Sequence, residues 1–185
     1  MNLTGVGGSF TLPGGSSATT YYATLVDNYA KAITVNALTT SYLKITDTLA
    51  DATYGKLSSI AINATGNFTL GALTLGTAGT QTVALTTSGA GTIALGDLSG
   101  AVSTTDRNVT SITSSGTGAL SAEIDPYYTS FNGGASGKDT VTIHYSATPT
   151  VATITGSTGG SNTLVLTDTA ANLGFGTNWT GTNFQ

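Results

Sequence analysis

Short β-branched segments separated by glycine recur along most of this chain, and they restrict the possible fold more than any other feature. Glycine, asparagine or aspartate precedes many of them, as turns between short strands require. The pattern predicts an all-β region over residues 61–185. The predicted strands are FTL 68–70, LTL 73–75, TVAL 82–85, TIAL 92–95, VTSI 109–112, ALSAEI 119–124, TVTIHY 140–145, ATIT 152–155 and TLVL 163–166.

The strand order is indicated by self-similarity and by the loops. The stretches AGTQTVALTTS and GAGTIALGDLS look like successive copies about ten residues apart. In a glycine-rich chain, such repetition is typical of a parallel solenoid. Antiparallel hairpins would need two-residue Asn-Gly or Asp-Gly turns, whereas the connections here are longer, as in GTAGT, TTSGAG and GSTGGSN. We therefore predict a parallel β-solenoid, with a β-sandwich as the alternative.

The first 60 residues have a different composition and form a separate predicted segment, residues 1–60. In SATTYYATLVDNYAKAI, apolar residues recur at spacings of three and four, which is one face of a helix. A second short helix is expected from Thr48 to about Leu57, and AITVNAL and YLKIT are expected strands between the two helices. The residues of the first helical face are Tyr22, Leu25, Val26, Tyr29 and Ile33.

The charge content is low and excludes some partners. Charged residues make up 8% of the 185 residues, and the formal net charge is −4; typical soluble domains have about 25% charged residues. Nucleic acid is not an expected partner, because phosphate binding needs clustered lysine and arginine. The sequence contains no apolar run of about 18 residues, so membrane insertion is not expected. The absence of cysteine fits an exported protein that does not depend on disulfides.

One glycine-rich stretch, GASGKDTVT at 134–142, fits a calcium-binding nonapeptide of the form G-G-x-G-x-D-x-U-x. Glycine-rich loops expose backbone carbonyl oxygens, and a carboxylate at the end of the loop can face the same ion. The matching positions include Gly134, Gly137 and Asp139, while Ala135 replaces the second glycine. The pattern recurs twenty-three residues later, with Asn162 in place of the aspartate.

Three stretches, GASGKDTVTI, ITGSTGGSNTLVLTDTAANLGF and TGTNFQ, are similar to the degenerate repeats of bacterial surface-layer proteins and large adhesins related to the repeats-in-toxin family. The resemblance covers about residues 40–185. It implies an extracellular, calcium-stabilised β-solenoid that self-assembles into a lattice or filament at the cell surface. The candidate calcium ligands are Asn132, Gly134, Gly137, Asp139, Asn162 and Asp168.

The resemblance also implies a route of export. Family members typically leave the cell through a type I secretion channel, with an uncleaved signal at the far C-terminus. The start of this chain, MNLTGVGGSFTLPGG, lacks the basic and apolar regions of a cleaved signal peptide. This agrees with type I secretion, provided that the solenoid continues beyond residue 185.

No catalytic constellation is visible, and we do not expect an enzyme. His144 is the only histidine, and we interpret it as a half-exposed sheet residue. Zinc would need three or four N or S ligands, and no GxSxG motif marks a nucleophile. Glu123 and Asp125 are two residues apart, so on a strand both side chains would point to one face. We interpret the pair either as a contact for a cell-surface polysaccharide or as a solvated strand end.

Threonine spacing suggests a second class of function. Thr-x-Thr motifs occur at 46–48, 140–142, 153–155 and 167–169. On a flat solenoid face, ladders of threonine can order water, as ice-binding proteins do. These positions share no repeat length, so β propensity alone also explains them. An ice-binding solenoid and a polysaccharide-binding module are therefore the alternatives to the surface-layer hypothesis.

Overall fold

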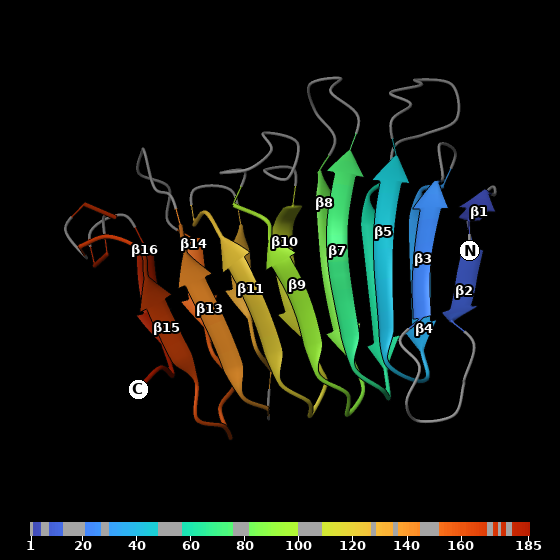
Figure 1. The fold of residues 1–185 in the computed structure, drawn as a ribbon. Helices are drawn as coiled ribbons and strands as arrows, with labels where there is room; N and C mark the ends of the chain where they lie inside the picture. Colours follow the sequence, from blue (N-terminus) through green and yellow to red (C-terminus); the bar gives the residue numbers. More distant parts are fainter. Residues whose placement is uncertain are drawn as a thin grey trace.

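The protein is a parallel β-solenoid with two sheets, as seen in a computed structural model (Figure 1). Each sheet has eight strands; sheet A contains the odd-numbered strands and sheet B the even-numbered ones. The chain alternates between the sheets, so each coil adds one strand to each. The structure describes residues 2–4, 8–12, 21–26, 30–47, 57–75, 82–99, 109–126, 129–134, 137–144, 152–169, 172–173, 175–176 and 179–185.

Every strand pairing is parallel, which confirms the predicted solenoid. The strands of sheet A are β1 Asn2–Thr4, β3 Tyr21–Val26, β5 Ser41–Asp47, β7 Phe68–Leu75, β9 Ile93–Asp97, β11 Leu120–Ile124, β13 Asp139–Ile143 and β15 Thr163–Leu166. The strands of sheet B are β2 Gly8–Leu12, β4 Ala32–Ala37, β6 Ser59–Ala64, β8 Val83–Ser88, β10 Val109–Ser114, β12 Ser130–Asn132, β14 Ala152–Thr155 and β16 Trp179–Thr182.

The connections from sheet B to sheet A form one side of the solenoid, which we call the corner side; these turns lie at the bottom of Figure 1. From residues 38–40 onward they lengthen along the chain, from residues 65–67 to residues 133–138 and 156–162. Because the strands are parallel, all the corner turns meet at the same edge of the stack. This edge therefore brings the glycine-rich turns of successive coils into contact.

The core lies between the sheets and is built from alternate residues of each strand, as period-2 side-chain geometry requires. In sheet B one inward column consists of large apolar side chains from β4 to β14, each at most 1% exposed. Full burial of such a side chain contributes about 1.5–3 kcal/mol to stability. The column therefore stabilises each coil by contact with its neighbours. Its members, in register, are Ile33, Ile60, Leu85, Ile112, Phe131 and Ile154.

A β-bulge interrupts the regular ladder of sheet A at Gly71. Leu43 pairs with Leu70, but Lys44 pairs with Ala72, so one residue of β7 is left over. A Cβ on Gly71 would lie 1.9 Å from the Tyr42 ring. The tyrosine thus lies against the bare glycine backbone, where no larger residue fits.

The helix expected over Tyr22 to Ile33 is wrong in the residues that the structure describes. Residues 21–26 form β3 in sheet A and residues 32–37 form β4 in sheet B. Leu25 and Ile33 are both buried, but they face the core from different sheets, because the chain passes from one sheet to the other between them. The helix expected over residues 48–57 lies outside the described residues, except for Leu57.

Most predicted strands are confirmed, and several were missed. FTL and LTL merge into β7, and AITVNAL and YLKIT correspond to β4 and β5. Strands β1, β2, β12 and β16 were missed, and each contains only three to five residues. The expected segment boundary at residues 60 and 61 falls inside β6, which pairs with β4 and β8. Among the described residues, no helix has the length and apolar character needed to cross a membrane.

Candidate functional site at the glycine-rich corner

Five of the six candidate calcium ligands lie on the corner side, and the sixth does not. Asn132 ends β12, Gly134 and Gly137 lie in the turn before β13, and Asp139 begins β13. Asn162 directly precedes β15, and since Thr163 pairs with Thr140, Asn162 lies beside Asp139. Asp168 follows β15 at the other end of that strand, six residues or about 20 Å of extended chain from Asn162.

Asp139 occupies a position that the three preceding coils fill with apolar residues, although the still earlier Ser41 in register is also buried and polar. The column of sheet A reads Phe68, Ile93, Leu120 and Asp139. Asp139 is 1% exposed, and its Oδ2 accepts a hydrogen bond of 2.8 Å from the Ser157 amide. Burial raises the pKa of Asp139 above its ordinary value, although the hydrogen bonds from Ser157 act in the opposite direction. The carboxyl group therefore faces the core.

The Asn162 side chain connects three successive coils. Its Oδ1 accepts hydrogen bonds from the Asp139 amide at 3.0 Å and from Ser157 Oγ at 2.8 Å. Its Nδ2 donates to the carbonyl oxygens of Ser157 at 2.6 Å and Asn183 at 2.7 Å. A primary amide has two acceptor and two donor positions, so every one is used. Asn162 is 2% exposed, and its full hydrogen bonding explains how the core tolerates it.

Ser157 is the partner shared by Asp139 and Asn162, and sequence reasoning missed it. Its amide binds Asp139, and its hydroxyl lies near both Asn162 and the Gly137 carbonyl oxygen, 3.1 Å away. It lies in the turn 156–162 within GSTGGSN, where nothing in the sequence distinguishes it from the neighbouring serine and threonine. Only the spatial approach of two coils reveals its role.

The corner glycines form a stack in which each coil meets the backbone of the coil before it. A Cβ on Gly91 would lie 1.9 Å from the Gly66 carbonyl oxygen, and a Cβ on Gly118 would lie 2.0 Å from that of Gly91. A Cβ on Gly160 would lie 1.4 Å from the Gly137 oxygen. The glycines of the predicted calcium-binding stretch thus allow neighbouring coils to pack closely, which a residue with a side chain would prevent.

The remaining candidates also have local structural partners. Asn132 Oδ1 accepts a hydrogen bond of 3.0 Å from the Gly134 amide, as in an Asx turn. Gly134 and Gly137 have φ values of 80° and 125°, which favour glycine. Asp168 is exposed and binds the Thr169 amide and the Asn172 side chain.

These contacts bear on metal binding. Calcium takes about 6–8 oxygen ligands, but both acceptor positions of Asn162 Oδ1 are already used, and Asp168 lies at the opposite end of β15. As the side chains stand, the six residues do not fit one calcium site. Within the described part of the chain, no three His, Cys, Asp or Glu side chains gather as a metal-binding group.

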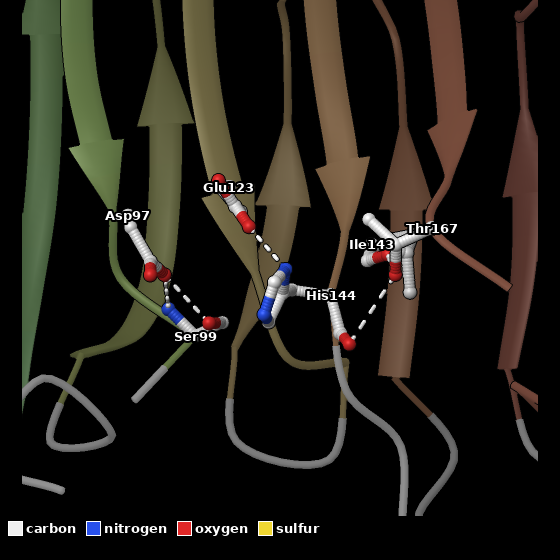
Figure 2. A network of polar contacts seen from close by, with 6 residues as sticks. All are labelled: Asp97, Ser99, Glu123, Ile143, His144 and Thr167. Carbon is white, nitrogen blue, oxygen red and sulfur yellow. Dashed lines mark hydrogen bonds and ion pairs between the residues drawn. The ribbon is translucent and has the colours of Figure 1, made fainter. Parts of the chain in front are cut away.

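A second polar group lies on the outer side of sheet A (Figure 2). Glu123 of β11 and His144, just after β13, point toward one another, and Glu123 Oε1 contacts His144 Nδ1. The His144 side chain is 37% exposed, as expected for a half-exposed residue. Asp97 pairs with Glu123 across the strands, and its Oδ1 accepts hydrogen bonds from the Ser99 amide and hydroxyl.

The expected pairing of Glu123 with Asp125 on one face is wrong. Strand β11 ends at Ile124, so Asp125 lies beyond it. Asp125 is 1% exposed, whereas Glu123 keeps 29% of its side chain exposed toward His144. A shallow hollow of about 240 Å³ lies beside Glu123 and Asp97, with Ser121, Thr140 and Thr142 around it.

The outer side of sheet B differs from that of sheet A because its side chains are small and uncharged. Strands β4 to β16 carry two outward columns in register, and we call these fourteen positions the uncharged face. The first column is Ala32, Ser59, Ala84, Ser111, Ser130, Thr153 and Thr180, and the second is Thr34, Ala61, Thr86, Thr113, Asn132, Thr155 and Thr182.

No family model, no curated protein and no solved structure matches this chain.

Proposed function

We propose that this chain is a structural module of an extracellular, self-assembling surface layer or adhesin. The observation that carries the proposal is the unbroken pairing of strands through both sheets, with each glycine-rich turn packed on the preceding one. Such a stack behaves as a stiff body, because every coil is hydrogen-bonded to its neighbours. A stiff body with broad, repeating faces is suited to a lattice, a filament or an adhesive stalk.

Low charge supports the same proposal. With only 8% charged residues and a net charge of −4, the repulsion that normally keeps copies of a protein apart is weak. The charged side chains that the structure describes lie on sheet A, on the turns or beside the strand ends. Copies can therefore approach through sheet B without bringing like charges together.

Assembly can be measured directly on the purified chain. Sedimentation velocity over a range of protein concentrations, combined with electron microscopy, should show particles larger than the 18.4 kDa monomer. The size should increase with concentration, because association follows mass action. A monomer at every concentration, with and without calcium, would contradict the proposed function.

Calcium stabilisation stays a prediction from the sequence. An ion bound by Asp139 and Asn162 would have to replace their bonds to Ser157, since the residues do not fit calcium as they stand. Thermal unfolding with calcium and with a chelator tests this for the wild type and for Asp139→Asn. A calcium-dependent rise in Tm that the variant loses would support the site. Equal Tm values of the wild type with calcium and with the chelator would rule out stabilisation by calcium, but they would not contradict the structural role.

Ice binding is a second candidate function, and the uncharged face favours it. Thr153 and Thr180 are in register, as are Thr155 and Thr182, so two neighbouring strands present Thr-x-Thr side by side. Hydroxyl and methyl groups then repeat at about 4.8 Å across strands and about 6.7 Å along them. Thermal hysteresis of the monomer is the test, and freezing at the same temperature as a matched inert protein would rule this function out.

A further inference from the structure

We propose that the uncharged face of sheet B is the surface through which two copies of this chain bind each other, face to face. The proposal rests on the structural function proposed above and names its interface. Three observations support it: the distribution of charge, the fixed positions of the outward side chains, and the area of the face.

Charge distinguishes the two sides of the solenoid. The outer side of sheet A carries Lys44, Asp97 and Glu123, with His144 at its edge. The uncharged face has no ionisable side chain among its fourteen positions. Interface cores are depleted of charged residues, and two copies of a chain with net charge −4 repel least where neither presents a charge. Association through sheet B is therefore favoured over association through sheet A.

Hydrogen bonds between neighbouring strands hold several polar side chains on this side of the solenoid. Asn63 Nδ2 donates to Asn36 Oδ1 at 2.9 Å, and Ser88 Oγ donates to Asn63 Oδ1. Thr182 Oγ1 donates to Thr155 Oγ1 at 3.2 Å. Side chains that are already fixed lose less conformational entropy when a partner covers them. The remaining outward residues are mostly Ala, Ser and Thr, which lose little in any case.

The area of the face is sufficient for a stable pair. Its two columns span seven strands, and the outward residues Asn36, Asn63 and Ser88 adjoin them and are also uncharged. With strands about 4.8 Å apart and, on average, about five residues long, this whole outer side covers roughly 550 Å² per copy. A pair then buries roughly 1,100 Å² in total, which clears the limit of about 1,000 Å² expected of a biological interface. Small side chains let two sheets approach to about 10 Å and interdigitate.

The expected symmetry is two-fold, because a face that binds itself forms an isologous contact. Strands β8 and β10 lie near the middle of the sheet order, so Thr86 and Thr113 lie near the two-fold axis. Both are exposed and pair with each other across the strands. They are the positions at which an added charge would disturb the contact most.

The test places two lysines near the centre of the uncharged face in the full chain, and the control places two lysines on the outer side of sheet A. Thr86→Lys with Thr113→Lys changes sheet B, and Thr140→Lys with Thr163→Lys is the matched control on sheet A, where the two threonines are also exposed and paired. Sedimentation equilibrium should show the dimer Kd raised at least tenfold in the sheet B variant and less than about twofold in the control. Equal shifts in both variants would overturn the proposal.

A cross-linking experiment covers the case in which the lysine variant folds poorly. The chain has no cysteine, so Thr113→Cys introduces the only thiol. Mild oxidation should yield a disulfide-linked dimer quickly in Thr113→Cys and slowly in Thr140→Cys. Equal rates in the two variants would contradict the face-to-face arrangement.

The outcomes separate this inference from the function on which it rests. If the wild type assembles and the sheet B lysines leave assembly unchanged, this interface is wrong while the structural function stands. If the wild type does not assemble, the structural function fails as well. If the wild type is monomeric and shows thermal hysteresis, the same face would bind ice instead of a second copy.

Discussion

Asn162 lies directly beside Asp139 in the next coil, and its Oδ1 accepts a hydrogen bond from the Asp139 amide at 3.0 Å. The two polar side chains continue a column that is apolar in the three preceding coils, where Phe68, Ile93 and Leu120 lie. Polar groups inside a core are tolerated when they are hydrogen-bonded, and Ser157 binds both of them. At the corner between β12 and β15, hydrogen-bonded polar side chains thus take the place of apolar side chains in the core.

Removing the Asn162 side chain should destabilise the protein strongly. Asn162→Ala leaves the Asp139 amide and the Asn183 carbonyl oxygen without this partner, and each buried polar group left unsatisfied costs about 1–3 kcal/mol. We expect the free energy of unfolding to fall by at least about 2 kcal/mol in urea denaturation. Asn67→Ala is the control, because Asn67 is exposed and bonds Ser41 through its backbone carbonyl oxygen, which alanine keeps. It should change stability by less than about 0.5 kcal/mol. Equal effects would contradict the role of Asn162.

The buried carboxyl group of Asp139 should give stability a specific dependence on pH. Burial raises the pKa of Asp139 above 3.8, so the folded state holds this proton more tightly than the unfolded state. Its contribution to the free energy of unfolding is therefore largest at low pH. That contribution decreases as the pH rises from about 3.8 through the folded pKa, and is constant above it.

Asp139→Asn removes this titration and keeps an oxygen that can accept the Ser157 amide. Urea denaturation of wild type and variant at a series of pH values gives the difference between the two curves. We expect that difference to change in favour of the variant as the pH rises through the window. A difference that is constant with pH would show that the carboxyl group does not titrate differently on folding.

The parallel fold was predictable because two signals agreed. The stretches AGTQTVALTTS and GAGTIALGDLS look like successive copies, and the loops are too long for tight hairpins. The helix at Leu25 and Ile33 was predicted wrongly because a strand, a turn and another strand can place apolar residues at helical spacings. Strand β12 has only three residues, which is too short for any periodicity to show.

The residues that the sequence analysis grouped at this corner lie together in the structure, but the directions of their side chains were not predicted. Gly134, Gly137 and Asp139 do lie together, and the twenty-three residues between Asp139 and Asn162 equal the offset between β13 and β15. Asp139 is two residues before Val141, so it faces the core with it, and this parity was already visible in the sequence. Ser157 could not be found, because its role depends on contact between coils.

Glycine at the corner should be required wherever a backbone carbonyl group approaches it. In Gly160→Ala, the new Cβ would lie 1.4 Å from the Gly137 carbonyl oxygen, so two coils would have to move apart. Overpacking of this kind costs about 1–3 kcal/mol. Gly181→Ala is the matched control, since its nearest neighbour is the flexible end of Leu164 at 3.2 Å. Urea denaturation should show a loss for Gly160→Ala and a change within about 0.5 kcal/mol for Gly181→Ala.

Trp179 should anchor the last described coil through its ring nitrogen. Its Nε1 donates a hydrogen bond of 2.7 Å to the Leu173 carbonyl oxygen, and the residue is 2% exposed. Trp179→Phe keeps an aromatic ring in the core but removes the donor, so we expect a loss of about 1–2 kcal/mol, measured by circular dichroism during urea denaturation.

Phe175→Leu separates this hydrogen bond from the aromatic contact. The Phe175 and Trp179 rings meet edge to face at 4.9 Å, but Phe175 is 38% exposed. Its replacement should therefore cost less than about 1 kcal/mol. Because the chain has one tryptophan, the emission of Phe175→Leu should stay at the wavelength of a buried indole until unfolding. A larger loss in Phe175→Leu than in Trp179→Phe would show that ring contact, rather than the hydrogen bond, stabilises this coil.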